Sequence, residues 1–257
     1  MSQAPDLAAM AARLDDAAMA ANAVAQLSAE AQITVPQAYE VQALNVGRRL
    51  SRGERLVGIK MGFTSRAKMI QMGLSDLIWG RLTSGMRLED GGVVDFARYV
   101  HPRIEPEVAF LLGAPLQGEV SPAEAGAAVE AVAPAMELID SRYRDFKFSL
   151  PDVIADNASS SGFVVGAWRD PAIDLATLGM VMEVDGVPAQ IGSSAAILGH
   201  PLRSLAAASR VVAGAGMRLE PGMIVLAGGA TAAVALKAGQ HVRMVAQGLG
   251  QVQVTVR

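Results

Sequence analysis

The most informative stretch of the sequence is PRIEPEVAF, residues 102–110. Its acidic and apolar residues alternate, which is typical of a β-strand whose successive side chains point to opposite faces of a sheet. We therefore expect Glu105 and Glu107 to share one face while the apolar residues pack on the other. Pro106 has no backbone N–H to donate to a neighbouring strand, so the segment is predicted to lie at a sheet edge or beside a bulge.

Two carboxylates on one strand face repel each other unless a proton or a cation lies between them. A hard cation such as Mg²⁺ or Mn²⁺, which prefers oxygen ligands, would remove that repulsion. A third acid, Glu137, lies inside the apolar run AMELI, residues 135–139, and a buried acid needs a partner. Two alternatives stay open at this point. Glu105 and Glu107 can be the solvent-exposed face of a strand, and Glu137 can pair with Arg142.

Composition narrows the class of protein. The chain has 257 residues, of which 51% are hydrophobic, so it can bury a large core. A net charge of −3 argues against a nucleic-acid partner, and the absence of cysteine excludes disulfides and thiolate chemistry. The N-terminus lacks the basic region of a signal peptide, and no stretch offers the ~20 predominantly apolar residues that span a bilayer. A cytoplasmic protein with no membrane partner is expected.

The chain divides near residue 50. Residues 1–50 are rich in alanine with apolar residues at helical spacing, and a second helix is predicted to begin at Thr34 with Pro36 in its first turn. From Leu56 onward, glycine, proline and short β-branched runs replace the helical period. We therefore predict an N-terminal helical segment, 1–50, and a β-rich catalytic domain, 51–257.

The β-rich part also contains helix signals and strand-sized runs. Ser121-Pro122-Ala123-Glu124 is a capping box that predicts a helix start, and Pro201 opens a helix that Gly214 or Gly216 should end. Strands are predicted at Met180–Val184, Met223–Ala227, His241–Ala246 and Gln251–Val256. Because regular βαβ alternation is lacking, the fold class is α+β with an antiparallel or mixed sheet.

Lys60 is the candidate for catalysis. It lies in the apolar, glycine-flanked run VGIKMGFT, residues 57–64, where it could stabilise an anionic substrate or a developing enolate. An ordinary lysine at a strand edge is the alternative. The polar clusters 140–143 and 155–161 can supply hydrogen bonds to a ligand, or simply close turns.

Five motifs together resemble the fumarylacetoacetate hydrolase superfamily. They are GIKMGFTSRAKM (58–69), RIEPEVAF (103–110), AMELIDSRY (135–143), ADNASS (155–160) and LGHPL (198–202). The resemblance implies a mixed β-roll core with an N-terminal helical part, and a site that holds Mg²⁺ or Mn²⁺. The residues that match the family's site are the metal ligands Glu105, Glu107 and Glu137, the active-site lysine Lys60, and Asp156 and Ser159 in a loop bordering the substrate.

Within this superfamily the chain is most similar to the hydratases and decarboxylases of aromatic meta-cleavage pathways. The stretch IDSRYRDFKF, residues 139–148, is similar to the decarboxylases, and Ile78 stands where hydratases tend to carry an acid. The resemblance thus implies a carbon–carbon lyase that converts 2-oxohex-3-enedioate into 2-hydroxypenta-2,4-dienoate and CO₂. Ile78 would contribute an apolar lining, and Arg142 is the candidate for binding the distal carboxylate of this small 2-oxo dicarboxylate.

Two other functions are weighed beside decarboxylation. The first is hydration of 2-hydroxypenta-2,4-dienoate, and the second is a non-catalytic subunit that steadies a pathway partner. The resemblance also implies association with the pathway hydratase, and a homo-oligomer is a further expectation.

Overall fold

The structure is a computed structural model that describes residues 4–65 and 77–257. The last four residues of the motif GIKMGFTSRAKM lie outside this part of the chain. Two helices come first, α1 (Leu7–Met19) and α2 (Val35–Ser51). As predicted, Thr34 caps α2 in a capping box with Gln37, and a proline occupies the first turn. Helix α2 is the last helix before the first strand.

The rest of the chain forms two sheets. The strands of the larger sheet are β1 (Leu56–Gly62), β2 (Ile78–Thr83), β3 (Arg87–Leu88), β5 (Arg103–Leu112), β6 (Val129–Ile139), β7 (Ser160–Val165), β10 (Ile224–Leu226) and β11 (Val234–Ala235). Their order is β2-β1-β10-β5-β6-β7-β3, with β11 also paired to β5. Most neighbours are antiparallel, whereas β1–β10 and β3–β7 are parallel, so the sheet is mixed as predicted.

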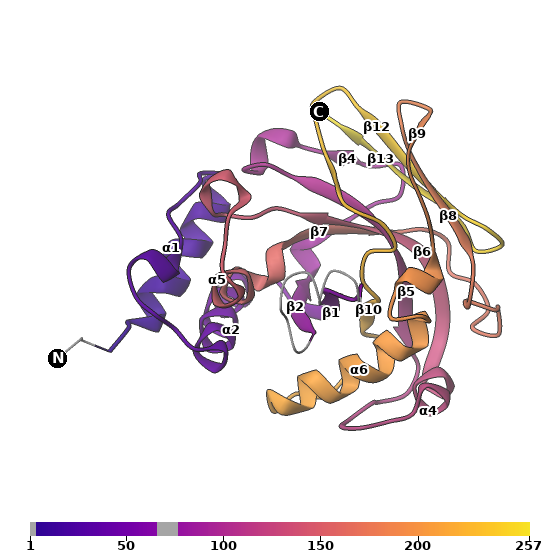
Figure 1. Ribbon diagram of the computed structural model, residues 1–257, viewed down its shortest axis with the longest axis horizontal. Helices are drawn as coiled ribbons and strands as arrows, with labels where there is room; N and C mark the ends of the chain where they lie inside the picture. The colour runs from indigo at the N-terminus through magenta and orange to yellow at the C-terminus, as the bar shows by residue number, and fades with distance from the viewer. Residues whose placement is uncertain (1–3, 66–76) are drawn as a thin grey trace.

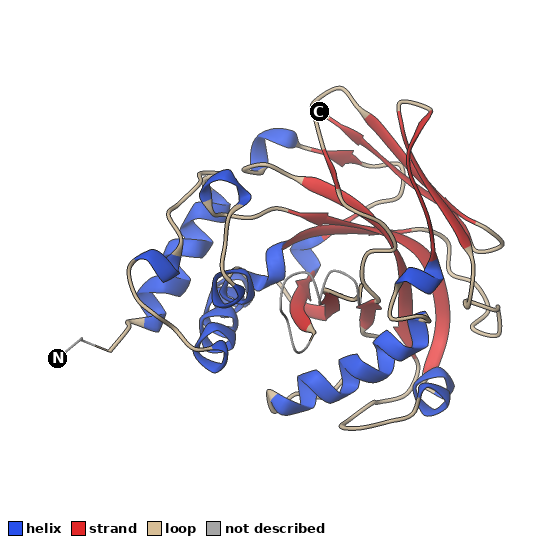
Figure 2. Cartoon of the chain, viewed as in Figure 1, coloured by secondary structure: helices blue, strands red, loops and turns tan. Residues whose placement is uncertain are grey.

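The smaller sheet contains most of the C-terminal strands. Its members are β4 (Val93–Val94), β8 (Gly179–Val184), β9 (Val187–Ser193), β12 (His241–Ala246) and β13 (Gly250–Val256), in the order β4-β13-β12-β8-β9. The four strands predicted in the last third of the chain are confirmed as β8, β10, β12 and β13. The two sheets curl over one another (Figure 2) and enclose the main core.

Residues 77–257 also form the helices α4 (Pro122–Ala127), α5 (Leu150–Ala155) and α6 (Pro201–Gly214). Helices α4 and α6 begin at the predicted prolines, and α6 ends at Gly214 as expected. In Figure 1, α1, α2 and α5 gather at one end of the molecule, and α6 runs below β10. Within the described ranges, no helix is both long and apolar enough to cross a bilayer.

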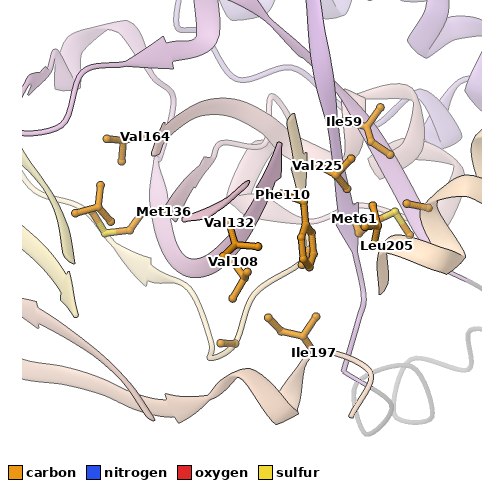
Figure 3. Packing of buried hydrophobic residues seen from close by; sticks show 14 of the residues in the cluster. Ile59, Met61, Val108, Phe110, Val132, Met136, Val164, Ile197, Leu205 and Val225 are labelled. Atoms are coloured by element: carbon orange, nitrogen blue, oxygen red, sulfur yellow. The ribbon is translucent and has the colours of Figure 1, made fainter. Parts of the chain in front are cut away.

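The main core lies on the apolar face of β5 and its neighbours. Phe110 on β5 and Val132 on β6 are register partners, and both are buried. Figure 3 shows them beside Val108 and Val225 in this cluster. A second apolar cluster joins the N-terminal helices to the β-rich part through residues such as Ile78. The helical segment is therefore packed against Ile78, a residue that lines a cavity in the β-rich part.

The predicted edge position of β5 is wrong, because this strand lies inside the larger sheet. β6 pairs along one side of β5, while β10 and β11 pair with the two ends of its other side. Between those ends a loop replaces a strand, and the Ala230 N–H donates to the Pro106 carbonyl oxygen at 2.9 Å. In a strand, the backbone N and O of one residue point the same way, so the Pro106 nitrogen faces this gap. The proline thus marks an interruption within the sheet, and the carboxylates lie beside it.

Candidate metal centre

Three glutamates meet on one face of the paired strands β5 and β6. Glu105 lies directly opposite Glu137 in the antiparallel register, and Glu107 follows on the same face of β5. One carboxylate oxygen of each residue lies within 4.8 Å of the other two. Glu107 and Glu137 are fully buried, whereas Glu105 is half-buried. The solvent-exposed alternative is therefore excluded for Glu107.

The electrostatics of this cluster are unfavourable on their own. Burial, followed by the charges of Glu137 and Glu105, raises the pKa of Glu107 well above its ordinary value. Lys60 on β1 supplies one compensating charge, because its Nζ lies 2.9 Å from Glu137 Oε2. Although burial alone would lower the pKa of Lys60, the three nearby acids raise it, so the ammonium stays charged. Glu137 thus pairs with Lys60, and the predicted alternative partner, Arg142, lies elsewhere.

Two carboxylate oxygens in the cluster are left without a partner. Within the described part of the chain, Glu107 Oε1 and Glu137 Oε1 are buried and accept no hydrogen bond. The other Glu107 oxygen accepts the Gly228 N–H at 2.6 Å. Buried carboxylate oxygens ordinarily have partners, because leaving them unsatisfied is costly. A divalent cation with oxygen ligands fits this set of donors, since it would both satisfy the oxygens and neutralise the excess charge.

Two glycines let the neighbouring loop approach the acids. A Cβ on Gly229 would lie 2.6 Å from Glu105 Oε2, and one on Gly228 would lie 2.2 Å from Thr64 Oγ1. Gly228 also has a φ of +107°, which favours glycine. These glycines were not predicted to be part of the site. Their signal was present, because an adjacent glycine pair inside an apolar run indicates close approach of the backbone.

The cluster opens into a cavity of about 320 Å³. The residues proposed from the sequence that line it are Lys60, Ile78, Glu105 and Ser159. The lining also includes Arg103 and Phe146, which the sequence analysis did not single out. Ile78 is almost fully buried, so this part of the wall is apolar.

Arg142 and Asp156 do not line this cavity. The Arg142 Nε and backbone N–H donate to the two Asp156 carboxylate oxygens, while Nη2 donates to the Asp156 carbonyl and Nη1 to Ser161 Oγ. Burial raises the pKa of Asp156 to about 6, although Arg142 opposes the shift. The prediction that Arg142 binds a distal carboxylate is therefore corrected, because its donors are engaged within the protein.

The Arg142–Asp156 pair instead holds the turn that presents Ser159. Asn157, Ala158 and Ser159 have φ values of 53°, 52° and 60°, a left-handed conformation that costs roughly 1–2 kcal/mol per residue. The Asn157 side chain accepts the Arg81 N–H and donates to the Arg81 carbonyl, which ties the turn to β2. Ser159 Oγ is buried and has no partner among the described residues. Strain of this kind is typical of a functional site.

Comparison with known proteins extends these observations. Residues 76–257 match the family described as fumarylacetoacetate (FAA) hydrolase, C-terminal. The chain is 63% identical over 241 residues to a 4-oxalocrotonate decarboxylase of a Pseudomonas species, which covers 94% of each protein. It is 36% identical over 244 residues to the 2-hydroxyhexa-2,4-dienoate hydratase of Comamonas testosteroni, covering 93% of this chain and 92% of that one.

A solved structure is similar over the whole chain. It is the 4-oxalocrotonate decarboxylase from Pseudomonas putida G7 complexed with magnesium and adipate. The TM-score is 0.96 at 38% identity, covering 100% of this chain and 99% of that chain. The likeness includes the N-terminal helices as well as the two sheets.

Proposed function

Because the chain belongs to the fumarylacetoacetate hydrolase family, we propose that it is a Mg²⁺-dependent carbon–carbon lyase that decarboxylates 2-oxohex-3-enedioate. The products are 2-hydroxypenta-2,4-dienoate and CO₂. The observation that carries this proposal is the 63% identity to a 4-oxalocrotonate decarboxylase over 94% of the chain. The buried glutamate cluster with its unpartnered oxygens supports a role for the metal in that reaction.

We propose Glu105, Glu107 and Glu137 as the metal ligands. Mn²⁺ would meet the same oxygen donors, although the similar decarboxylase structure contains magnesium. When bound, the cation supplies Lewis acidity, which lowers the energy of negative charge at the 2-oxo oxygen of the substrate.

The reaction shifts three electron pairs along a conjugated chain, the last of which is the C2–O π pair that moves onto the oxygen. The C5–C6 bond breaks and C6 leaves as CO₂, while its electron pair forms the C4–C5 double bond. The C3–C4 π pair moves to C2–C3, and the C2 oxygen takes the negative charge and then a proton. The ammonium of Lys60 lies in the cavity wall, so it can stabilise this charge.

The cavity wall also favours decarboxylation over hydration. The apolar side chain of Ile78 offers no group that could activate water, and it helps to exclude water from the diene product. The hydratase relatives keep water addition to 2-hydroxypenta-2,4-dienoate as the second candidate function. The Ser159 hydroxyl, buried beside the cavity, would bind a polar group of the substrate.

The deciding experiment incubates the protein with 2-oxohex-3-enedioate and Mg²⁺, with and without a chelator. We expect CO₂ release that the chelator abolishes. Water addition to the C5 dienol without CO₂ release from the diacid would instead indicate a hydratase. If neither reaction occurs and titration calorimetry detects no Mg²⁺ binding, the non-catalytic subunit becomes the better explanation. Association with a pathway hydratase and a homo-oligomeric state remain predictions for analytical ultracentrifugation.

A further inference from the structure

Arg103 is a cationic side chain in the cavity wall to which the mechanism assigns no role. It begins β5 and lies on the same strand face as Glu105, two residues before it. It is half-buried and lines the cavity. Among the residues that the structure describes, no acidic side chain forms an ion pair with it, in contrast to the buried Arg142. Its guanidinium is thus available to an anion in the cavity.

An aromatic ring holds the Arg103 guanidinium in place. The guanidinium carbon lies 4.3 Å from the centre of the Phe146 ring. That ring also contacts His101, at 5.2 Å between ring centres, and Phe148, at 5.7 Å. A guanidinium packed on a ring is stabilised through its face, while the N–H groups at its edge remain available for a planar carboxylate.

The spacing along β5 matches the length of a six-carbon diacid. The Cα atoms of residues i and i+2 on a strand are about 7 Å apart, since the rise is ~3.4 Å per residue. The two carboxyl carbons of an extended six-carbon diacid are separated by ~6 Å, from bonds of ~1.5 Å. A substrate whose 2-oxo acid end lies at the glutamates is therefore long enough for its other carboxylate to reach Arg103.

We propose that Arg103, seated on Phe146, binds the distal carboxylate and makes the site selective for 2-oxo dicarboxylates over monocarboxylates of equal length. The inference rests on the proposed function in one respect, namely that the 2-oxo acid end lies at the glutamate cluster. Binding at the edge of the guanidinium also orients the C5–C6 bond. Decarboxylation requires that this bond be perpendicular to the plane of the conjugated system, so that its electrons can enter the π orbitals. Arg103 thus takes the role that the sequence analysis gave to Arg142.

The test compares two unreactive ligands by titration calorimetry in the presence of Mg²⁺. These are 2-oxoadipate and 2-oxohexanoate, which share chain length and lack the double bond through which CO₂ is lost. We expect the wild-type protein to prefer the diacid. Arg103→Met should weaken diacid binding ~10- to 100-fold, the range for a hydrogen bond to a charged group, and change monoacid binding less than about twofold. Phe146→Leu should also weaken diacid binding, but by a smaller factor than Arg103→Met.

The matched control is Arg144→Met. It removes an exposed arginine that lies two residues before Phe146 and outside the cavity lining. It should leave both affinities unchanged, which separates a direct contact from a general loss of positive charge. Undiminished diacid binding by Arg103→Met, or equal weakening of both ligands, would overturn the role of Arg103 while leaving the proposed function intact. Failure of the wild-type protein to bind either ligand with Mg²⁺ would instead overturn the proposed function, and this inference with it.

Discussion

The protein buries two clusters of charged side chains that are built on opposite principles. In the first, Glu105, Glu107 and Glu137 are accompanied by Lys60, and two carboxylate oxygens have no partner within the described residues. In the second, the Asp156 carboxylate receives hydrogen bonds from Arg142 at both oxygens. Among the described residues, the first cluster keeps unused carboxylate acceptors, whereas the second is neutral and satisfied.

This difference is the one expected between a ligand site and a structural element. A satisfied buried pair has no affinity left for a ligand, and breaking it exposes an uncompensated charge. A cluster with surplus acceptors is unfavourable until something binds there, so its substitution should affect binding more than folding. Substituting one cluster at a time tests that distinction.

The largest effect is expected for Glu107→Gln, which removes a charge and keeps the shape of the side chain. Mg²⁺-dependent CO₂ release should fall by at least ~10³-fold, because several kcal/mol of stabilisation from the metal are lost. Titration calorimetry should show the matching loss of Mg²⁺ affinity, and thermal unfolding should show an intact fold. The control is Glu183→Gln in the smaller sheet, where Glu183 pairs with Arg243. Full activity of Glu107→Gln would refute the metal site.

Arg142→Met is expected to act on stability instead. It leaves Asp156 buried without its partner, so the free energy of unfolding in urea should fall by about 3–5 kcal/mol. Arg243→Met breaks a more exposed pair and should cost less than ~1 kcal/mol. Mg²⁺ affinity should stay near the wild-type value in the folded protein. The comparison would fail if Arg142→Met kept full stability and lost ligand binding.

Much of this arrangement could be predicted from local sequence. The strand alternation around Glu105 and Glu107 placed both acids on one face, and the capping signals at Thr34, Ser121 and Pro201 marked helix starts. Such signals are local, because each depends on backbone geometry within a few residues. Glu137 and Lys60 were candidates because each lies in an apolar run, and the resemblance to a family then implied their roles as a metal ligand and the active-site lysine.

Contacts between distant segments could not be predicted in this way. The partner of Arg142 is 14 residues away, and the sequence offers several acids at comparable separations. The central position of β5 was hidden because Pro106 faces a gap between two other strands, which the pairing of the whole sheet creates. The packing of Arg103 against Phe146 likewise joins two segments that are distant in the sequence and that only the fold brings together.

An intermediate effect is expected for Lys60→Met, which removes the positive charge of the first cluster and preserves its buried stem. Turnover should fall about 10²-fold, the scale of one preorganised electrostatic group, while KM changes little. Steady-state kinetics at saturating Mg²⁺ would measure both quantities. A rise in KM with unchanged turnover would make Lys60 a binding residue.

The smallest effect on stability is expected at Ser159. It compares a buried hydroxyl without a partner with a buried hydroxyl that is hydrogen-bonded. Its hydroxyl has no partner in the described structure, so Ser159→Ala should change the free energy of unfolding by less than ~0.5 kcal/mol. The matched control is Ser209→Ala, which removes a buried hydroxyl that donates to the Gly118 carbonyl at 2.8 Å and should cost about 1 kcal/mol.

Activity should show the reverse order. Ser159→Ala should raise KM several-fold because Ser159 lines the cavity, and Ser209→Ala should leave it unchanged. If Ser159→Ala proved the more destabilising variant and kept its wild-type KM, an unsatisfied buried group could no longer be taken here as the mark of a ligand site.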